Sequence, residues 1–147
     1  MALFLSLIKK MKFISYLFFF FLIMNCNAQK ELNLKEVTYE AFTRGSNIEL
    51  KITTDSIIYT ENQKAKRTKI KSDTWNKIKK LVSKIDLSKI ENFSSPTENR
   101  NSDKAMHASL KVDVNNVEHV SQTFDHGNPP IALKPLVDFL FKIAEIK

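Results

Sequence analysis

Apolar and polar residues alternate in two stretches of the chain, the period of a strand with one buried face. Ile48, Leu50 and Ile52 alternate with charged and polar residues in 48–53, and the same period runs through 108–114. Three further β-prone stretches occupy residues 36–42, 57–59 and 65–70. The last of these is rich in lysine, which suits a sheet edge because charged side chains discourage edge-to-edge pairing.

Two segments show a helical period instead. Ser72 is the predicted N-cap of the first helix. Its apolar residues recur at steps of three and four: Trp75, Ile78, Leu81, Val82 and Ile85. Pro135 suits the first turn of the second helix. The apolar stripe of that helix comprises Leu136, Phe139, Leu140 and Ile143. Each helix is therefore expected to pack one face against a sheet.

The strand at 108–114 is followed by Asn115 and Asn116, a turn signal that predicts a second hairpin. A three-residue loop, 115–117, would set Val112 opposite Val120 and Ala108 opposite Phe124. A two-residue loop would instead oppose Val112 with His119. Because pairing of apolar with apolar residues keeps one face buried, the pattern favours the longer loop.

The element order is therefore β-β-β-β-α-β-β-α. This order predicts an α+β fold, with an antiparallel sheet of about five to six strands and two helices packed on one face. The polar segment 92–103 contains Pro96 and is expected to form a long surface loop.

The N-terminal residues 1–28 have the pattern of a secretory signal peptide. A basic start at Met11-Lys12 precedes the apolar run 13–24 and the small-residue cleavage motif 26–28. The apolar run is shorter than the roughly 20 residues that a membrane-spanning helix requires, so no permanent span is predicted. The sequence thus predicts export to the periplasm or the extracellular space after cleavage near Ala28.

Cys26 leaves a second interpretation open. Acylation of this cysteine would make the protein a lipoprotein, although Asn25 replaces the small residue expected before it. Either way, residues 29–147 have a length that suits one exported α+β domain. This part of the chain contains no cysteine, which excludes disulfides and thiolate chemistry.

Basic residues are concentrated between Lys64 and Lys89. This segment holds ten lysines and arginines but only Asp73 and Asp86 as acids. Its local excess of positive charge predicts attraction to polyanions, which for an exported protein means anionic lipid, acidic glycan or an envelope protein rather than nucleic acid. The candidate ligand-binding residues are Lys64, Lys66, Arg67, Lys77, Lys80 and Lys84. A solvated face that keeps the domain soluble is the alternative interpretation.

Three residues form the candidate catalytic set. The longer hairpin loop would bring His107 opposite Asp125, with His126 next in the chain. A histidine and a carboxylate side by side can act as a general base or take part in a metal site. The spacing does not define a zinc site, and Asp125 and Asn128 are also typical turn formers. No cofactor or metal is therefore predicted.

Other catalytic motifs are absent from the sequence. It contains neither a phosphate-binding glycine loop, nor a Gly-x-Ser-x-Gly elbow, nor a His-Glu-x-x-His helix. Arg44 and Arg100 lie in expected loops, where an arginine either recognises a ligand carboxylate or ties loops together through an acid such as Asp103 or Asp125.

Several local motifs together resemble small secreted proteins of unknown function from Bacteroidetes. These motifs are Asn27-Ala28-Gln29, Arg44-Gly45-Ser46, Ile85-Asp86-Leu87, Pro96-Thr97 and the run from Phe124 to Pro130. The resemblance spans most of residues 29–147. It implies an exported compartment and a fold, and it assigns no catalytic residues.

Two hypotheses for function follow. The preferred one is a non-enzymatic exported binding module that works through the free face of the sheet, the loop 94–103 or the basic segment 64–89. The alternative is a small metal-dependent or general-base hydrolase that uses His107, Asp125 and His126.

Overall fold

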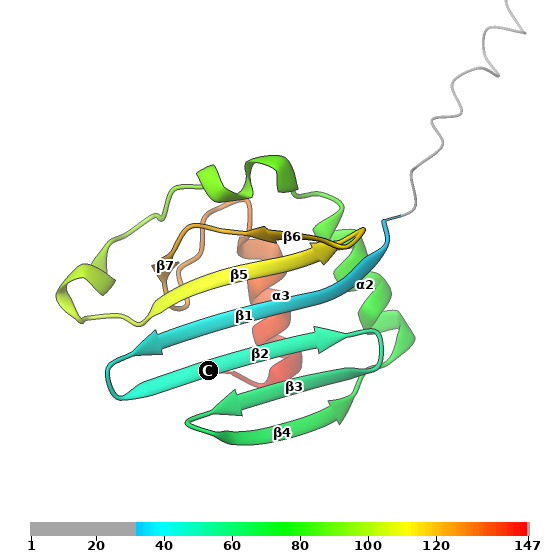
Figure 1. Ribbon diagram of the computed structural model, residues 1–147, viewed down its shortest axis with the longest axis horizontal. Coiled ribbons are helices and arrows are strands. Elements are labelled where there is room, and N and C mark those ends of the chain that lie inside the picture. The colour runs from blue at the N-terminus through cyan, green and yellow to red at the C-terminus, as the bar shows by residue number, and fades with distance from the viewer. Residues whose placement is uncertain (1–31, 147) are drawn as a thin grey trace, which may run out of the picture. The chain divides into compact units, whose positions relative to one another are not determined.

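Seven strands form one antiparallel sheet in the computed structural model, which describes residues 32–146 (Figure 1). The strands are β1 (Leu34–Thr43), β2 (Ser46–Thr53), β3 (Ser56–Glu61), β4 (Lys64–Lys69), β5 (His107–Val114), β6 (Val117–Val120) and β7 (Phe124–Asp125). Their spatial order is β4-β3-β2-β1-β5-β6, and β7 also pairs with β5. The α+β fold predicted from the sequence is thus confirmed, with β7 as an additional short strand. The predicted signal peptide and Cys26 lie outside the described residues.

The first four strands are joined in sequence by tight turns. Thr43 pairs with Ser46 around Arg44 and Gly45, which confirms the loop expected at Arg44. The turn between β3 and β4 places Asn62 and Gln63 at positive φ, 46° and 69°. Because consecutive strands pair through short connections, β4 ends up at one edge of the sheet, with one side of its backbone unpaired.

The predicted three-residue loop after β5 is wrong. Asn115 and Asn116 form a two-residue turn with φ of 55° and 62°, so Val112 pairs with His119. Asparagine tolerates positive φ, and a two-residue turn of this kind matches the twist of the strands it joins. The turn chemistry therefore outweighed apolar pairing, and Val117 and Val120 remain exposed.

Further along β5, where β7 takes the place of β6, the predicted register is restored. Three residues separate Val120 from Phe124, whereas two separate their partners Lys111 and Ala108. The extra residue acts as a bulge that shifts the pairing by one position. Phe124 consequently pairs with Ala108 and reaches the core, as the hydrophobic pattern predicted.

Two α-helices lie on the same face of the sheet (Figure 1). They are α2 (Ser72–Val82) and α3 (Lys134–Ala144), with Pro135 in the first turn of α3. The N-cap of α2 is Lys71 rather than the predicted Ser72, because its extended backbone, not a side-chain hydrogen bond, precedes the first turn. Two short 3-10 helices, η1 (Leu87–Asn92) and η2 (Asn99–Ser102), occupy the connection from α2 to β5. None of the helices within residues 32–146 combines the length and apolar character needed to cross a membrane.

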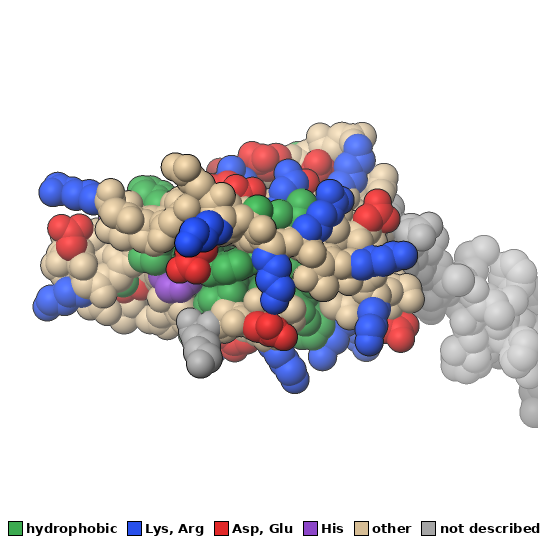
Figure 2. All heavy atoms as spheres, turned by 90° about the horizontal axis from the view of Figure 1, so that it is seen from below, with side chains coloured by type: hydrophobic (Ala, Val, Ile, Leu, Met, Phe, Trp, Pro, Cys, Tyr) green, Lys and Arg blue, Asp and Glu red, His purple; other side chains and the backbone are tan. Residues whose placement is uncertain are grey.

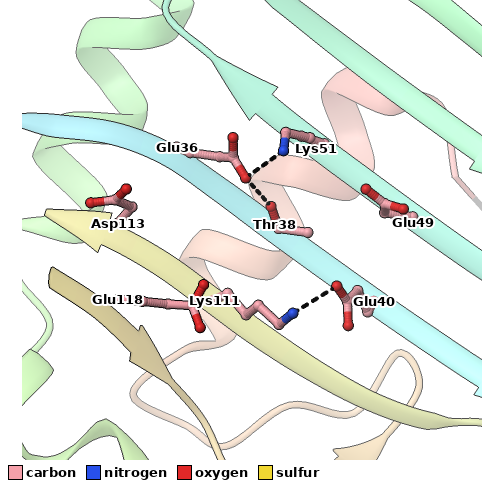
Figure 3. A pocket seen from close by; sticks show the side chains of 8 residues that line it. All are labelled: Glu36, Thr38, Glu40, Glu49, Lys51, Lys111, Asp113 and Glu118. Carbon is pink, nitrogen blue, oxygen red and sulfur yellow. Dashed lines mark hydrogen bonds and ion pairs between the residues drawn. The ribbon is translucent and has the colours of Figure 1, made fainter. Parts of the chain in front are cut away.

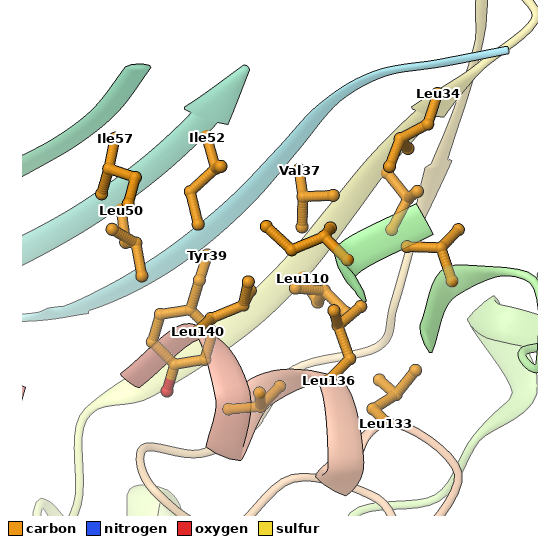
Figure 4. Close-up of a cluster of buried hydrophobic side chains, with 14 of the residues drawn as sticks. Leu34, Val37, Tyr39, Leu50, Ile52, Ile57, Leu110, Leu133, Leu136 and Leu140 are labelled. Carbon is orange, nitrogen blue, oxygen red and sulfur yellow. The ribbon is translucent and has the colours of Figure 1, made fainter. Parts of the chain in front are cut away.

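The core fills the space between the sheet and the two helices. Alternate residues of the central strands point to this side, among them Tyr39, Leu50 and Leu110, and all three are fully buried. They face Leu136 and Leu140 of α3 (Figure 4). The other face of the sheet carries the intervening polar side chains, and no helix within residues 32–146 covers it (Figure 1).

Candidate functional site

The six basic residues singled out in the sequence are all exposed. Lys64, Lys66 and Arg67 lie on β4, the edge strand, whose six residues are exposed along its whole length. Lys77, Lys80 and Lys84 lie on or just after α2 at steps of three and four, so they share one face of that helix. We call these six residues the basic surface. Figure 2, which shows the molecule from the β4 side, has blue lysine and arginine side chains from its middle toward its right-hand end.

Contacts with α3 place Lys66 and Lys77, one residue from each half of the basic surface, on the helix side of the molecule. The Lys66 amine lies 3.6 Å from the carboxylate of Glu145, at the end of α3. The Lys77 amine lies 4.4 Å from the centre of the Phe139 ring, on the same helix. Six residues of helix span about 9 Å, so Lys66 and Lys77 flank the C-terminal half of α3. Lys64 and Lys66 thus lie on the same side of the sheet as α2, whereas Arg67, one position further along β4, points from the same edge toward the free face.

Little within the described residues neutralises this surface. Lys66 alone of the six lies within 4.0 Å of an acid in residues 32–146, and both partners of that ion pair are largely exposed. Exposed ion pairs of this kind contribute little free energy, so the Lys66 amine stays available. The contact of Lys77 with Phe139 leaves its positive charge unpaired. The surface therefore retains most of its positive charge.

The free face of the sheet has the opposite charge. A shallow hollow of about 220 Å³ in its centre is lined by eight residues: Glu36, Thr38, Glu40, Glu49, Lys51, Lys111, Asp113 and Glu118 (Figure 3). Two ion pairs cross it, Lys51 with Glu36 at 2.9 Å and Lys111 with Glu40 at 3.0 Å. The remaining three acids leave the hollow negative, so the free face would repel the anions that the basic surface attracts.

The three candidate catalytic residues do not converge on one point. His107 and Asp125 are backbone partners in the β5–β7 ladder, as predicted. The His107 ring stacks on Phe42, with centroids 5.5 Å apart, whereas Asp125 points into the loop that precedes β5. His126 contacts Tyr39 instead. No hydrogen bond joins any two of the three side chains within residues 32–146, and no group of three or more metal-ligating side chains was found there.

Asp125 organises the loop between η1 and β5. Its carboxylate accepts hydrogen bonds from the Thr97 hydroxyl at 2.5 Å and from the backbone N–H of Asn99 at 2.8 Å. It also accepts from the Arg100 backbone N–H at 3.0 Å and from the Arg100 guanidinium at 3.2 Å. The side chain is about 3% exposed. Arg100 thus ties two loops together through Asp125, one of the two acids that the sequence suggested.

These hydrogen bonds hold Asp125 as a carboxylate. Desolvation by burial works to raise its pKa, but the donors of Thr97, Arg100 and Asn99 outweigh it and lower the pKa to about 2. A general base at neutral pH needs free lone pairs and a pKa close to the working pH. The geometry therefore favours the structural role of Asp125 over the hydrolase hypothesis.

His126 is part of an aromatic cluster beneath the sheet. Its Nδ1 lies 2.9 Å from the Tyr39 hydroxyl, and the Tyr39 oxygen also accepts a hydrogen bond from the Gly127 N–H at 3.4 Å. Phe141 of α3 packs against both rings. Desolvation lowers the pKa of His126, which favours the neutral ring. His126 is thus half-buried rather than solvated, and it links β1, the 126–130 loop and α3.

Sequence reasoning missed two features of these sites. The partnership of Tyr39 with His126 spans 87 positions, and no local pattern signals it. The acidic hollow gathers side chains from four strands, β1, β2, β5 and β6. The sequence did carry a signal for this hollow, because several polar positions of the alternating strands are acids. Once β1 is placed between β2 and β5, the acids at the outward positions of these three strands must share the free face.

Comparison with known proteins adds no relative from which a function can be inferred. No family model, curated protein or solved structure matches the chain.

Proposed function

We propose that this protein is an exported, non-enzymatic binding module that attaches to an anionic lipid surface through its basic surface. The observation that carries this proposal is the exposure of six basic side chains along the β4 edge and α2, five of them without an acidic partner within residues 32–146. Each lysine or arginine close to an anionic membrane contributes about 1 kcal/mol of binding free energy. Several acting together suffice for reversible attachment.

The form of the basic surface favours a lipid surface over a single bound anion. Its side chains are spread along an edge strand and a helix and do not surround one pocket. Five of the six are lysines, which act as mobile point charges rather than as rigid forks for one phosphate or carboxylate. Headgroups that diffuse laterally can adjust to such a spread of charges, whereas one small ion can meet few of them.

The charges on the two faces also indicate how the protein would be oriented on the lipid surface. The acidic hollow on the free face of the sheet is repelled by anionic headgroups, so it would point away from the lipid (Figure 3). The β4 edge and the outer stripe of α2 would then lie against the headgroups. An exported protein released near Ala28 would meet such a surface in the envelope, and acylation of Cys26 would hold it there.

The test is co-sedimentation of the exported protein with vesicles. Vesicles that contain phosphatidylglycerol should bind the protein, and pure phosphatidylcholine vesicles should not. Binding should weaken strongly as salt rises, because exposed charges are screened over about 8 Å at physiological ionic strength.

Equal binding to both kinds of vesicle, or binding that salt does not weaken, would contradict the electrostatic account. If the protein ignores both vesicles but is retained by an acidic glycan in the same buffer, the basic surface has a different ligand and the lipid proposal fails.

A further inference from the structure

Two adjoining hollows open beside the basic surface, on the helix-facing side of β3 and β4. The first, of about 390 Å³, is lined by Tyr59, Glu61, Asn62, Lys64, Ala65 and Lys66. The second, of about 270 Å³, shares Tyr59 and Lys66 with the first and adds Ile57, Thr68, Ile143, Ala144 and Glu145. They adjoin at these two side chains, and we call the two hollows together the groove.

The groove lies where the helix layer leaves part of the sheet uncovered. The last turn of α3 ends at Ala144, and α2 lies beside α3 toward the end of β4, so the parts of β3 and β4 next to their connecting turn have no helix over them within residues 32–146 (Figure 1). Ile57 is 8% exposed and Tyr59 is half-buried, whereas all of β4 is exposed. Figure 2 shows green apolar side chains exposed among the blue ones on this side.

The groove combines apolar and basic side chains, as a site for an anionic amphiphile would. Ile57, Ile143 and Ala144 give it apolar walls. Lys64 and Lys66 also line it, and Lys66 forms an ion pair with Glu145 in which the two side chains are 72% and 81% exposed. A hydrocarbon chain would cover the apolar walls, while an anionic head would meet the two amines.

We propose that this groove binds one acyl or alkyl chain of an anionic amphiphile, with its phosphate or carboxylate head between Lys64 and Lys66. This inference rests on the proposed lipid-binding function and deepens it, because it adds a defined chain site to a diffuse electrostatic contact. Glu61 and Glu145 also line the groove, so a free anion gains little there. Burial of the chain supplies the affinity, and the amines select the head.

Calorimetric titration with single-chain probes below their micelle-forming concentrations tests the proposal. Decyl phosphate should bind saturably. Octyl phosphate should bind about tenfold more weakly, because it buries two fewer methylenes. Decyl maltoside, which has a neutral head, should also bind about tenfold more weakly, and inorganic phosphate should show no saturable binding. Equal binding of inorganic phosphate and decyl phosphate would overturn the chain site.

A pair of variants locates the site. Thr68 lines the groove and is exposed, so Thr68→Trp should block the groove without changing the charge, and it should weaken decyl phosphate binding at least tenfold. Thr60→Trp makes the same change on the neighbouring strand but on the free face, and it should bind as the wild type does. Unchanged binding by Thr68→Trp would overturn the assignment.

The same samples separate this inference from the proposed function. Thr68→Trp keeps the basic surface and should still sediment with phosphatidylglycerol vesicles. If vesicles bind but decyl phosphate does not, the groove proposal fails and the lipid-surface proposal stands. If decyl phosphate binds but anionic vesicles do not, the lipid-surface proposal fails and the groove remains a site for free amphiphiles.

Discussion

Replacing Lys64, Lys66 and Arg67 together by glutamine should weaken binding to phosphatidylglycerol vesicles by about 100-fold, because each basic residue near the surface contributes about 1 kcal/mol. All three side chains are exposed on the edge strand β4, so their loss removes charge without opening the core. The dependence of binding on salt should become shallower in the same variant, since fewer charges then meet the lipid. Co-sedimentation over a range of lipid and salt concentrations measures both effects.

The matched control removes the same net charge elsewhere. Lys104, Lys111 and Lys134 lie outside the basic surface, and Lys111 and Lys134 are already paired with Glu40 and Asp138. Their replacement by glutamine should change vesicle binding no more than a few-fold. Equal losses in the two triple variants would show that binding follows net charge rather than this surface.

Asp125→Asn should lower the melting temperature at neutral pH by on the order of 10 °C. The carboxylate accepts four hydrogen bonds from the 97–100 segment while it is almost fully buried. An asparagine turns an NH₂ group toward some of these donors and leaves the Arg100 guanidinium without its counter-ion. Thermal melts followed by circular dichroism measure the change. Asp103→Asn, an exposed change in the same connection, should leave the melting temperature nearly unaltered.

The pH dependence of the same variant identifies the cause. The pKa of Asp125 is lowered from its usual 3.8 to about 2 in the folded protein, so the unfolded chain takes up a proton first as the pH falls. The stability that the carboxylate contributes is therefore complete above about pH 4 and is lost toward pH 2. The melting temperatures of the wild type and of Asp125→Asn should converge over this range. A constant difference would mean that the carboxylate charge is not what the loop requires.

The sheet was predictable from the sequence because its signals are local. Ile48, Leu50 and Ile52 alternate with polar residues, and that period gives both the strand and its buried face. The loop after β5 was predicted wrongly because two signals conflicted there, apolar pairing against the positive φ of Asn115 and Asn116. The local turn preference won, and a bulge further along restored the pairing of Phe124.

The candidate site, too, was predictable from the sequence only where its signals are local. Lys64, Lys66 and Arg67 were found because they are close in sequence and because lysine and arginine are rarely buried. The groove beside them could not be predicted, since it joins β3 and β4 to the end of α3, more than 70 positions away. Its position depends on where α3 ends relative to the sheet edge, which is a property of packing rather than of any local motif.

The most direct test of the account maps the lipid contact residue by residue. Amide NMR spectra of the protein, recorded with and without nanodiscs that contain phosphatidylglycerol, should show changes confined to β4, the outer stripe of α2 and the end of α3. The amides beneath the acidic hollow, such as those of Glu40 and Glu49, should not change. Changes centred on the free face of the sheet, or none at all, would contradict the claim that the basic surface binds anionic lipid.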